Sequence, residues 1–314
     1  MKLVSYNHVS GIRGGVLIED AVYDLELLLR GSATAGAGAV SSVRSFLELY
    51  GDRLAAISAE VTALAVRDPD ARVGARTDVE LSTPVPDPAK VLCVGLNYKN
   101  HVAETGRAFP EYPDVFAKFP STMVGPEDEI GGARLSENLD FEGELAVVIG
   151  RTASNISEDE ALEYVAALAP LNDVTARDLQ YRGTQWLAGK AVDGSTPWGP
   201  ALVTLDEVGD PQALDLVTRV NGIEVQRSNT RHQIFPIARI IAYLSSFLTL
   251  EPGDVIATGT PEGIGAKRNP PVWLAPGDTV EIEIEKVGLL RNQVATPDHD
   301  RGLDKNSSLQ DLRK

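Results

Sequence analysis

The chain has 314 residues, of which 43% are hydrophobic and 24% charged, so it can bury a sizeable core in one large domain or two smaller ones. Its formal net charge of −16 disfavours nucleic acid and anionic membranes as partners, because both are bound through basic patches. Cys93 is the only cysteine, which excludes a disulfide framework and a cysteine metal cluster, and its apolar neighbours predict a core residue.

Residues 1–82 predict a small N-terminal α/β accessory domain. Its expected elements are a meander of strands at 2–6, 15–19 and 21–25, a Gly/Ala/Ser-rich loop at 31–39, and helices at 41–50 and 53–66. A stiff proline-rich linker follows at 83–90 and marks the best domain boundary. Residues 1–6 lack the apolar run of a signal peptide, and no stretch has the roughly 18 apolar residues of a membrane span. We therefore expect a cytoplasmic protein with no membrane partner.

Residues 91–297 predict a larger, β-rich domain, and residues 298–314 a polar tail. Strands are expected at 90–95, 142–149, 201–204, 214–220, 254–258 and 279–286, helices at 97–106, 157–169 and 235–248, and a loop at 107–120. The helix at 157–169 is predicted from the capping-box spacing of Ser157 and Glu160. Many strands with few helices indicate the α+β fold class.

Two glutamates, Glu142 and Glu144, lie two residues apart in a predicted strand, so their carboxylates share one face. A hydrophobic run follows directly, which predicts that this face is half buried. Buried carboxylates repel each other, and a hard divalent cation bound through oxygens offsets that cost. Asp173 is the best candidate for a third ligand. The alternative is a solvent-facing pair on an edge strand, and the spacing alone leaves both open.

His101 and Glu104 lie three residues apart in a predicted helix, which places both on one face. A carboxylate beside an imidazole orients the ring and raises its basicity, which suits the activation of water. The alternative is an ordinary exposed ion pair. The loop at 107–113, which follows directly, is a candidate lid over a site.

A second group of polar residues begins at Asp173. On a helical turn Asp173, Arg177 and Gln180 share one face, and the arginine suits a substrate carboxylate. The alternative is a structural Arg-Asp network with Asp178. Lys190 follows an apolar run, where a lysine either stabilises a developing oxyanion or extends along the apolar surface to solvent.

The stretch 258–265 is a glycine-rich turn after a strand, and its glycines allow backbone N–H groups to approach an anion closely. It lacks the Gly-Lys-Ser/Thr ending of a phosphate-binding loop and the Gly-x-Gly-x-x-Gly of a dinucleotide fingerprint. The turn therefore predicts a contact with an anion, but its sequence does not identify that anion.

Taken in order, these segments resemble the fumarylacetoacetate hydrolase family over roughly residues 91–294. The matching residues are Val94-Gly95-Leu96-Asn97-Tyr98 with His101 and Glu104, Phe116-Ala117-Lys118, Asp140-Phe141-Glu142-Gly143-Glu144, Asn172-Asp173-Val174-Thr175-Ala176-Arg177-Asp178 with Gln180, Lys190, Asp193, Pro197, Gly199-Pro200, and Gly259-Thr260-Pro261-Glu262-Gly263. The resemblance implies a catalytic domain with the family's mixed β-roll, and a homodimer.

The resemblance also implies a role for each matched residue. Glu142, Glu144 and Asp173 match ligands of Mg²⁺ (or Mn²⁺), and His101 with Glu104 matches a water-activating dyad on a mobile lid. The other implied site residues are Lys190 near the metal and Arg177, Gln180, Thr260, Tyr98 and Lys118 around the substrate. One departure is Asn97, which stands where fumarylacetoacetate hydrolases proper carry a metal-ligating Asp. This chain therefore resembles the smaller-substrate branch, with a water completing the shell.

From the resemblance we expect a metal-dependent hydrolase that cleaves a C–C bond in a 2,4-dioxo acid, an acylpyruvate of aromatic catabolism. Water activated by His101 attacks the 4-carbonyl, and pyruvate leaves as an enolate that the metal and Lys190 stabilise. The alternatives are an oxaloacetate decarboxylase, a 2-hydroxyhepta-2,4-diene-1,7-dioate-type isomerase and, more remotely, a non-catalytic metal-dependent binding protein. Specificity is expected to depend on residues 107–120, Trp186 and Trp198.

Overall fold

The computed structural model of the chain describes residues 1–30 and 40–296, and the expected loop at 31–39 and tail at 298–314 lie outside the described residues. The strands are β1 (Lys2–His8), β2 (Gly11–Ile18), β3 (Ala21–Asp24), β4 (Arg72–Ala75), β5 (Leu81–Ser82), β6 (Val91–Gly95), β7 (Asp114–Lys118), β8 (Met123–Val124), β9 (Leu139–Asp140), β10 (Gly143–Ile149), β11 (Val165–Asn172), β12 (Thr175–Ala176), β13 (Thr196–Pro197), β14 (Leu202–Thr204), β15 (Asp215–Val220), β16 (Ile223–Asn229), β17 (Val255–Ala257), β18 (Thr279–Ile284) and β19 (Gly288–Gln293). The α-helices are α1 (Leu25–Leu29), α2 (Val43–Tyr50), α3 (Leu54–Arg67), α4 (Lys99–Thr105), α5 (Arg177–Gln180), α6 (Leu187–Lys190), α7 (Leu205–Val208) and α8 (Ile237–Ser245). Short 3₁₀ turns are η1 (Pro69–Ala71), η2 (Arg76–Asp78), η3 (Pro120–Thr122), η4 (Ala161–Tyr164), η5 (Thr230–His232) and η6 (Gly265–Lys267).

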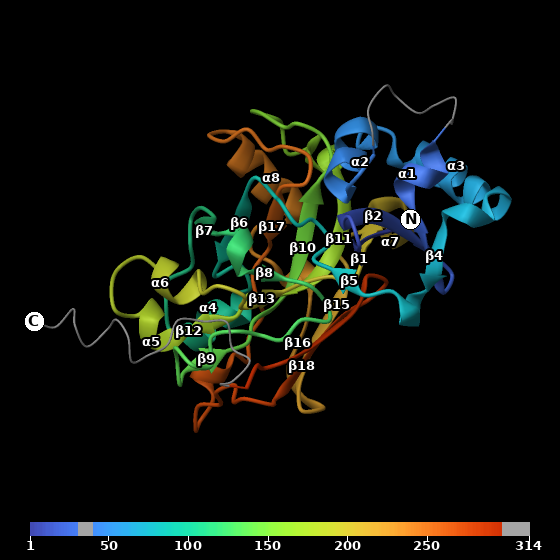
Figure 1. The fold of residues 1–314 in the computed structure, drawn as a ribbon. Coiled ribbons are helices and arrows are strands. Elements are labelled where there is room, and N and C mark those ends of the chain that lie inside the picture. The colour runs from blue at the N-terminus through green and yellow to red at the C-terminus, as the bar shows by residue number, and fades with distance from the viewer. Residues whose placement is uncertain (31–39, 297–314) are drawn as a thin grey trace, which may run out of the picture.

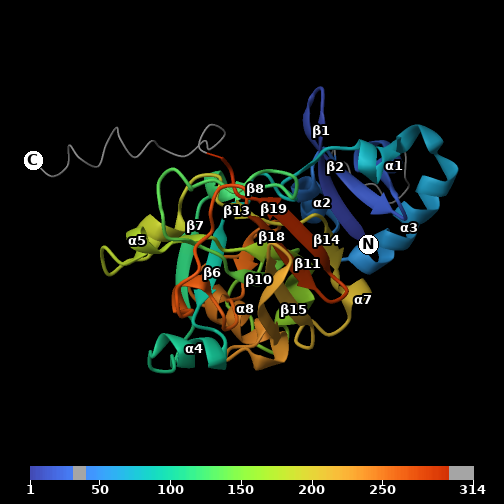
Figure 2. The ribbon, with the colours of Figure 1, turned by 90° about the horizontal axis from the view of Figure 1, so that it is seen from below.

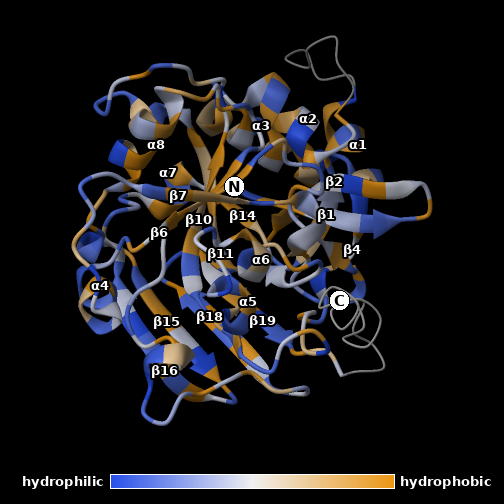
Figure 3. Cartoon of the chain, turned by 90° about the vertical axis from the view of Figure 1, so that its left-hand side faces the viewer, coloured by the Kyte–Doolittle hydropathy of each residue, from blue (hydrophilic) through white to orange (hydrophobic). Residues whose placement is uncertain are grey.

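One mixed sheet of eleven strands runs through the molecule in the order β4-β3-β2-β1-β14-β11-β10-β17-β6-β7, with β5 paired to β1 (Figure 1). All residues of its central strands β10 and β11 are buried. Side chains alternate across β10, so Ala146 and Val148 pack into one apolar cluster and Leu145 and Val147 into another. The sheet is therefore the middle layer between two cores, and in Figure 3 the strands that meet at the centre are mostly orange.

Different elements cover the two faces of this sheet. The N-terminal helices cover one face, with Phe46 of α2 and Ile57 of α3 in its core. Helix α8 covers the other face together with a second, four-stranded antiparallel sheet in the order β16-β15-β18-β19. Leu216 and Ile282 of that sheet pack in the same core as Ile240 and Leu244 of α8. The β-rich α+β class expected from the sequence is confirmed.

Helix α2 shows how local sequence sets these elements. Ser42 is its N-cap and accepts from the Ser45 N–H, while the Ser45 hydroxyl accepts from the Ser42 N–H. Val43, Phe46 and Tyr50 lie three or four residues apart and are fully buried, so one face of the helix enters the core. The Ser-capped helix expected at 41–50 is confirmed.

The N-terminal part is continuous with the rest of the fold. Strand β1 pairs with β14 through Leu3 and Leu202, and Leu3 packs in the same core as Ala146. The linker lies against both parts, because Ser5 donates to the Pro84 carbonyl and the Trp198 indole donates to the Thr83 hydroxyl. The division at 83–90 stays a prediction from composition, since sheet and core run across it. Figure 1 places α1, α2 and α3 at the opposite end of the molecule from α4, α5 and α6, and Figure 2 shows the same separation from α4 and α5.

The helix predicted at 157–169 is wrong. Ser157 and Glu160 do make capping contacts, since the N–H and hydroxyl of Ser157 both donate to the Glu160 carboxylate. Only the turn η4 follows, and residues 165–172 form β11. The apolar run fits a buried strand as well as a helix, and pairing with both β10 and β14 decides for the strand.

The loop predicted at 107–120 is also partly wrong, because residues 114–118 form β7, which pairs along all of β6. Strands β4, β16 and β19 were likewise not expected. Each of the three lies at the end of a sheet or beside one partner strand, where half-exposed residues give a weak apolar pattern. Among the helices of residues 1–30 and 40–296, none combines the length and apolarity needed to cross a membrane.

Because the core spans both parts, a cavity made in β1 should destabilise the whole chain. We expect Leu3→Ala, at a fully buried position, to lower the free energy of unfolding by about 2–5 kcal/mol. All three tryptophans lie after the linker, and Trp198 packs in the same core as Leu3, so their fluorescence during denaturant unfolding reports whether the larger part unfolds together with that shared core. Leu289→Ala, at a position 47% exposed, is the matched control and should change little. An unshifted tryptophan transition in Leu3→Ala would show that the two parts unfold independently.

Candidate active site

A cavity of about 430 Å³ lies at one edge of the large sheet. The carboxyl ends of β6 and β17, which run parallel, meet there with the amino end of β10 and the carboxyl end of β11. Because β10 and β11 are antiparallel, Glu142 before β10 and Asp173 after β11 are neighbours, and the Asp173 N–H donates to the Glu142 carbonyl at 2.9 Å. Sheet pairing therefore brings together side chains that lie far apart in the sequence.

Three carboxylates meet in this cavity. Glu142, Glu144 and Asp173 each present one oxygen, and these oxygens all lie within 4.8 Å of one another. All three side chains are buried, and the two glutamates share one face of the strand, as their spacing predicts. The alternative of a solvent-facing glutamate pair on an edge strand is wrong, because β10 is a central strand.

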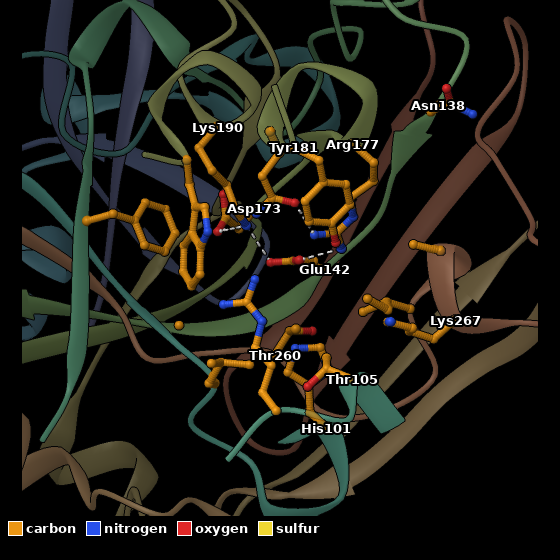
Figure 4. A pocket seen from close by; sticks show the side chains of 18 of the residues that line it. His101, Thr105, Asn138, Glu142, Asp173, Arg177, Tyr181, Lys190, Thr260 and Lys267 are labelled. Carbon is orange, nitrogen blue, oxygen red and sulfur yellow. Dashed lines mark hydrogen bonds and ion pairs between the residues drawn. The ribbon is translucent and has the colours of Figure 1, made fainter. Parts of the chain in front are cut away.

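Three buried cations surround two of the carboxylates, and Figure 4 shows two of them, Lys190 and Arg177. Lys190 Nζ lies 2.6 Å from Glu142 Oε2 and 2.6 Å from Asp173 Oδ2, and Lys118 Nζ lies 2.7 Å from Asp173 Oδ1. Arg177 Nη2 lies 2.5 Å from Glu142 Oε1. Burial raises the pKa of Glu142, but attraction to Lys190 and Arg177 outweighs it and lowers this pKa to about 2. The side chain of Lys190 is 3% exposed, so the alternative in which it extends to solvent is wrong.

Glu144 stands apart because no lysine or arginine of the described residues pairs with it. Its carboxylate accepts the Gly259 N–H at 2.7 Å. Burial, followed by repulsion from Asp173 and Glu142, raises the pKa of Glu144 well above its usual range. The cluster therefore needs one more positive charge to keep Glu144 ionised. Three oxygens converging on one point with that charge deficit fit a hard divalent cation.

The histidine of the expected dyad lines the same cavity. His101 Nδ1 lies 2.7 Å from Glu104 Oε1, and the other Glu104 oxygen accepts the Gly263 N–H at 2.9 Å. Because an ionised carboxylate only accepts, Nδ1 carries the proton and Nε2 is the basic nitrogen. His101 is 6% exposed, so the alternative of an ordinary exposed ion pair is wrong. In Figure 4 His101 and Thr260 lie on one side of Glu142, with Lys190 and Arg177 on the other.

The glycine-rich turn holds the carboxylates of the site itself. The Gly259 N–H donates to Glu144, and the Gly263 N–H donates to Glu104. The Gly265 N–H and that of Ala266, directly after the turn, donate to Asp140. Gly259 and Gly263 have φ of 100° and 99°, a region that favours glycine, and a Cβ on Gly259 would lie 2.7 Å from Asn97 Cβ. The anion contact predicted from the glycines is present, and the anions are protein side chains.

Asp140 is a site residue that the sequence reasoning missed. It accepts from Arg177 Nε at 2.8 Å and from the backbone N–H groups of Gly265 and Ala266 at the end of the glycine-rich turn. Burial raises the pKa of Asp140, and this effect outweighs the attraction to Arg177, which lowers it. Asp140 fixes the guanidinium so that its other nitrogen meets Glu142. The available signal was spacing, since 140, 142 and 144 continue one period-two series.

The expected helical turn through Asp173, Arg177 and Gln180 is wrong in its first member. Asp173 precedes the short strand β12, and only 177–180 are helical. The residues still meet, because Arg177 Nη1 donates to Gln180 Oε1 at 3.0 Å and Lys190 links Asp173 to Glu142. Arg177 does not form the alternative pair with Asp178, which instead accepts from Ser136. Asp140, Glu142 and Gln180 already occupy its guanidinium.

The residues expected around the substrate divide into two groups. Arg177, Gln180 and Thr260 line the cavity, whereas Tyr98 and Lys118 do not. Tyr98 is fully buried and bridges to Gln233 through the backbone, and Lys118 supports Asp173 from behind.

Asn97 and Trp198 are also held away from the cavity. The Asn97 side chain bonds the backbone of Phe235 and Thr258, so it fixes two loops. Trp198 is fully buried against Thr83, which makes its expected part in specificity wrong, whereas Trp186 does line the cavity.

Comparisons with known proteins agree with this geometry. The fumarylacetoacetate hydrolase C-terminal model matches residues 90–295. The mitochondrial oxaloacetate tautomerase fahd2 of Xenopus laevis is 41% identical over 283 residues, which cover 90% of this chain and 83% of that protein. The fumarylacetoacetate hydrolase structure from Exiguobacterium antarcticum has a TM-score of 0.76 and 35% identity, covering 94% of this chain and 99% of that one. The Sphingobium sp. SYK-6 maleylpyruvate hydrolase, solved with manganese(II) and pyruvate, has a TM-score of 0.72 and 31% identity, covering 94% and 99%.

These relatives establish the family of the chain but not its specific reaction. They include a tautomerase and hydrolases, so the enzymatic class is broader than the C–C hydrolase expected from the sequence. The cytoplasmic location and the homodimer stay predictions, and the Xenopus relative is described as mitochondrial. The family model covers about two thirds of the chain, and the relatives extend the match into the N-terminal part. The chain belongs to the fumarylacetoacetate hydrolase family.

Proposed function

We propose that the chain catalyses keto–enol proton transfer at C3 of a small 2-oxo acid of the oxaloacetate type. The observation that carries the proposal is the His101–Glu104 dyad, whose imidazole lines the same cavity as the three-carboxylate cluster. The similarity to an oxaloacetate tautomerase supports the substrate class.

Glu142, Glu144 and Asp173 are the residues that would hold a divalent cation, either Mg²⁺ or Mn²⁺. The maleylpyruvate hydrolase solved with manganese(II) supports this assignment. When bound, the cation supplies positive charge that favours the enolate form of a neighbouring 2-oxo acid. The chain's own part is to keep the three oxygens close together, and Lys190 does so by joining Glu142 to Asp173.

The proton moves through one histidine. Nε2 of His101 accepts the proton from C3, and Glu104 stabilises the resulting imidazolium through its bond with Nδ1–H. Nε2–H then donates the same proton to the 2-oxo oxygen. No water is consumed and the charge balances, so one base that returns its proton suffices.

Lys190 and Arg177 contribute fixed positive charge. Burial lowers the pKa of each, but attraction to Glu142 and its neighbouring aspartates outweighs burial and leaves both values raised. Neither side chain is therefore a base at neutral pH. Their charge favours the negative oxygen that develops as C3 loses its proton.

Hydrolysis of a C–C bond in a 2,4-dioxo acid is the second candidate. The similarity to a maleylpyruvate hydrolase supports it, and His101 Nε2 would then take its proton from water. Decarboxylation of oxaloacetate and isomerisation of an unsaturated dioxo acid share the same enolate and are the remaining enzymatic alternatives. A non-catalytic metal-dependent binding protein would bind metal stoichiometrically without any turnover.

The proposal is tested by giving the Mn²⁺-loaded protein oxaloacetate and acetylpyruvate in parallel. We expect faster loss of the oxaloacetate enol absorbance, with no release of CO₂ above the protein-free rate. Cleavage of acetylpyruvate, with oxaloacetate equilibrating at its uncatalysed rate, would replace the proposal by the second candidate.

Replacing the base should separate binding from turnover. We expect His101→Ala to reduce turnover by about 10²–10⁴-fold, the usual contribution of a positioned general base, while Mn²⁺ affinity stays unchanged. Lys99→Ala, an exposed position on the same helix α4, is the matched control. Full turnover in His101→Ala would remove the dyad from the reaction.

Replacing Glu144 by its neutral isostere should separate charge repulsion from cation binding. Without metal, Glu144→Gln should melt at or above the wild-type temperature, because repulsion from Glu142 and Asp173 is lost and the Gly259 bond is kept. With Mn²⁺ the wild-type melting temperature should rise and that of the variant should rise less. The measurement is thermal unfolding in EDTA and in Mn²⁺. An equal rise in both proteins would contradict the assigned ligand set.

A further inference from the structure

The cavity that holds the acidic cluster has a neighbouring lobe of about 410 Å³. The two spaces share the lining residues Arg107, Phe116, Gln180, Tyr181 and Trp186. The second lobe lies on the side of β7 and the segment after α5. It contains none of the three clustered carboxylates, and the acidic residue in its lining is the exposed Asp114. The site therefore has room for a substrate portion that extends away from those carboxylates.

Arg107 stands where the two spaces meet, and its side chain is exposed. Arg177 and Lys190, which also line the main cavity, are held by buried carboxylates. Arg107 has no carboxylate within ion-pair distance among residues 1–30 and 40–296, and its guanidinium carbon lies 5.3 Å from the Trp186 ring centroid. A cation–π contact positions a guanidinium while leaving its N–H edge free for an anion.

Trp186 is itself held in place. Its ring meets Phe116 edge-on, with centroids 5.6 Å apart. Gly95 makes room for it, because a Cβ there would lie 2.5 Å from the indole. The stacked pair of Trp186 and Arg107 is thus supported by β6 and β7, which are strands of the main sheet.

The charge of the substrate suggests a role for Arg107. A 2-oxo dicarboxylate is a dianion, and the chain carries a net charge of −16, so each end of such a substrate needs a local cation. One end, the 2-oxo acid, belongs at the acidic cluster with its divalent cation. The other end then lies in the part of the cavity where Arg107 offers two parallel N–H donors, the geometry that fits a carboxylate.

We propose that Arg107 binds the distal carboxylate of the substrate and makes the site selective for 2-oxo dicarboxylates over 2-oxo monocarboxylates. This inference rests on the proposed function for the placement of the 2-oxo acid end. Arg107 follows α4 after Gly106, which ends that helix in the left-handed conformation at φ 72°. Arg107, which contacts the distal carboxylate, is therefore separated by Gly106 alone from the helix that carries His101 and Glu104.

The test measures binding, so it does not depend on turnover. Mn²⁺-loaded wild type and Arg107→Met are titrated calorimetrically with pyruvate and with 3,3-difluoro-oxaloacetate, a dicarboxylate that lacks C3 protons and cannot enolise. We expect Arg107→Met to weaken the dicarboxylate about tenfold or more and to leave pyruvate within about twofold, as the loss of one charge-assisted contact predicts. Arg107→Lys, which keeps the charge and loses the planar fork, should lie between the two proteins.

Two further variants distinguish a specific contact with Arg107 from a general effect of removing one positive charge. Arg67→Met removes an exposed charge from the last turn of α3, far from the cavity, and should change neither affinity. Lys267→Met removes the other exposed cation of the main cavity and should weaken binding of the dicarboxylate less than Arg107→Met does.

Equal weakening of pyruvate and the dicarboxylate in Arg107→Met, or no weakening of either, would overturn the proposal. So would a loss carried by Lys267→Met instead. The dicarboxylate preference is measurable even in a chain that turns over no oxaloacetate, so the two proposals fail separately.

Discussion

The compensation of buried charge at Glu142 and Asp173 is the interaction on which the site depends. Both carboxylates are buried, and Lys190 holds them together with two contacts of 2.6 Å. A buried charge that loses its only partner typically costs about 3–5 kcal/mol. Here each carboxylate has a second buried cation, because Arg177 also contacts Glu142 and Lys118 also contacts Asp173. Glu144, in the same cluster, has no such partner among the described residues. Lysine and arginine side chains thus compensate the charges of Glu142 and Asp173. The charge of Glu144 is left to be compensated by a bound cation.

The backbone sets the second constraint. Three carboxylates of the site, Asp140, Glu104 and Glu144, accept N–H groups from the single turn after β17. Backbone donors carry no net charge, so they position the carboxylates without adding positive charge. The turn can approach this closely where its residues are glycines, since a Cβ on Gly265 would lie 2.6 Å from Asp140 Oδ1. One segment therefore aligns the acidic cluster with the dyad.

Sequence reasoning succeeds here where chemistry is local and fails where it is assembled by pairing. Glu142 and Glu144, or His101 and Glu104, meet through spacing within one element, and the sequence predicts both pairs. The helix predicted at 157–169 from the capping-box spacing overlaps the start of β11. The apolar run there fits a helix or a buried strand, and only pairing with β10 and β14 selects the strand. The cations bound to Glu142 and Asp173 depend on that pairing. Single-sequence patterns therefore predict residue types in the site better than they predict their partners.

The two halves of the site differ in how firmly they are held, and this difference bears on specificity. The acidic cluster is built from central strands with buried partners on every side, so a substitution there disturbs charge balance and packing together. The dyad and Arg107 lie on or directly after α4, a seven-residue helix on which only His101 and Val102 are buried. Changes in that segment cost little packing and still face the cavity. Under the proposed function, enolate chemistry would stay at the cluster while changes in the α4 segment alter which substrate end is recognised and which proton moves.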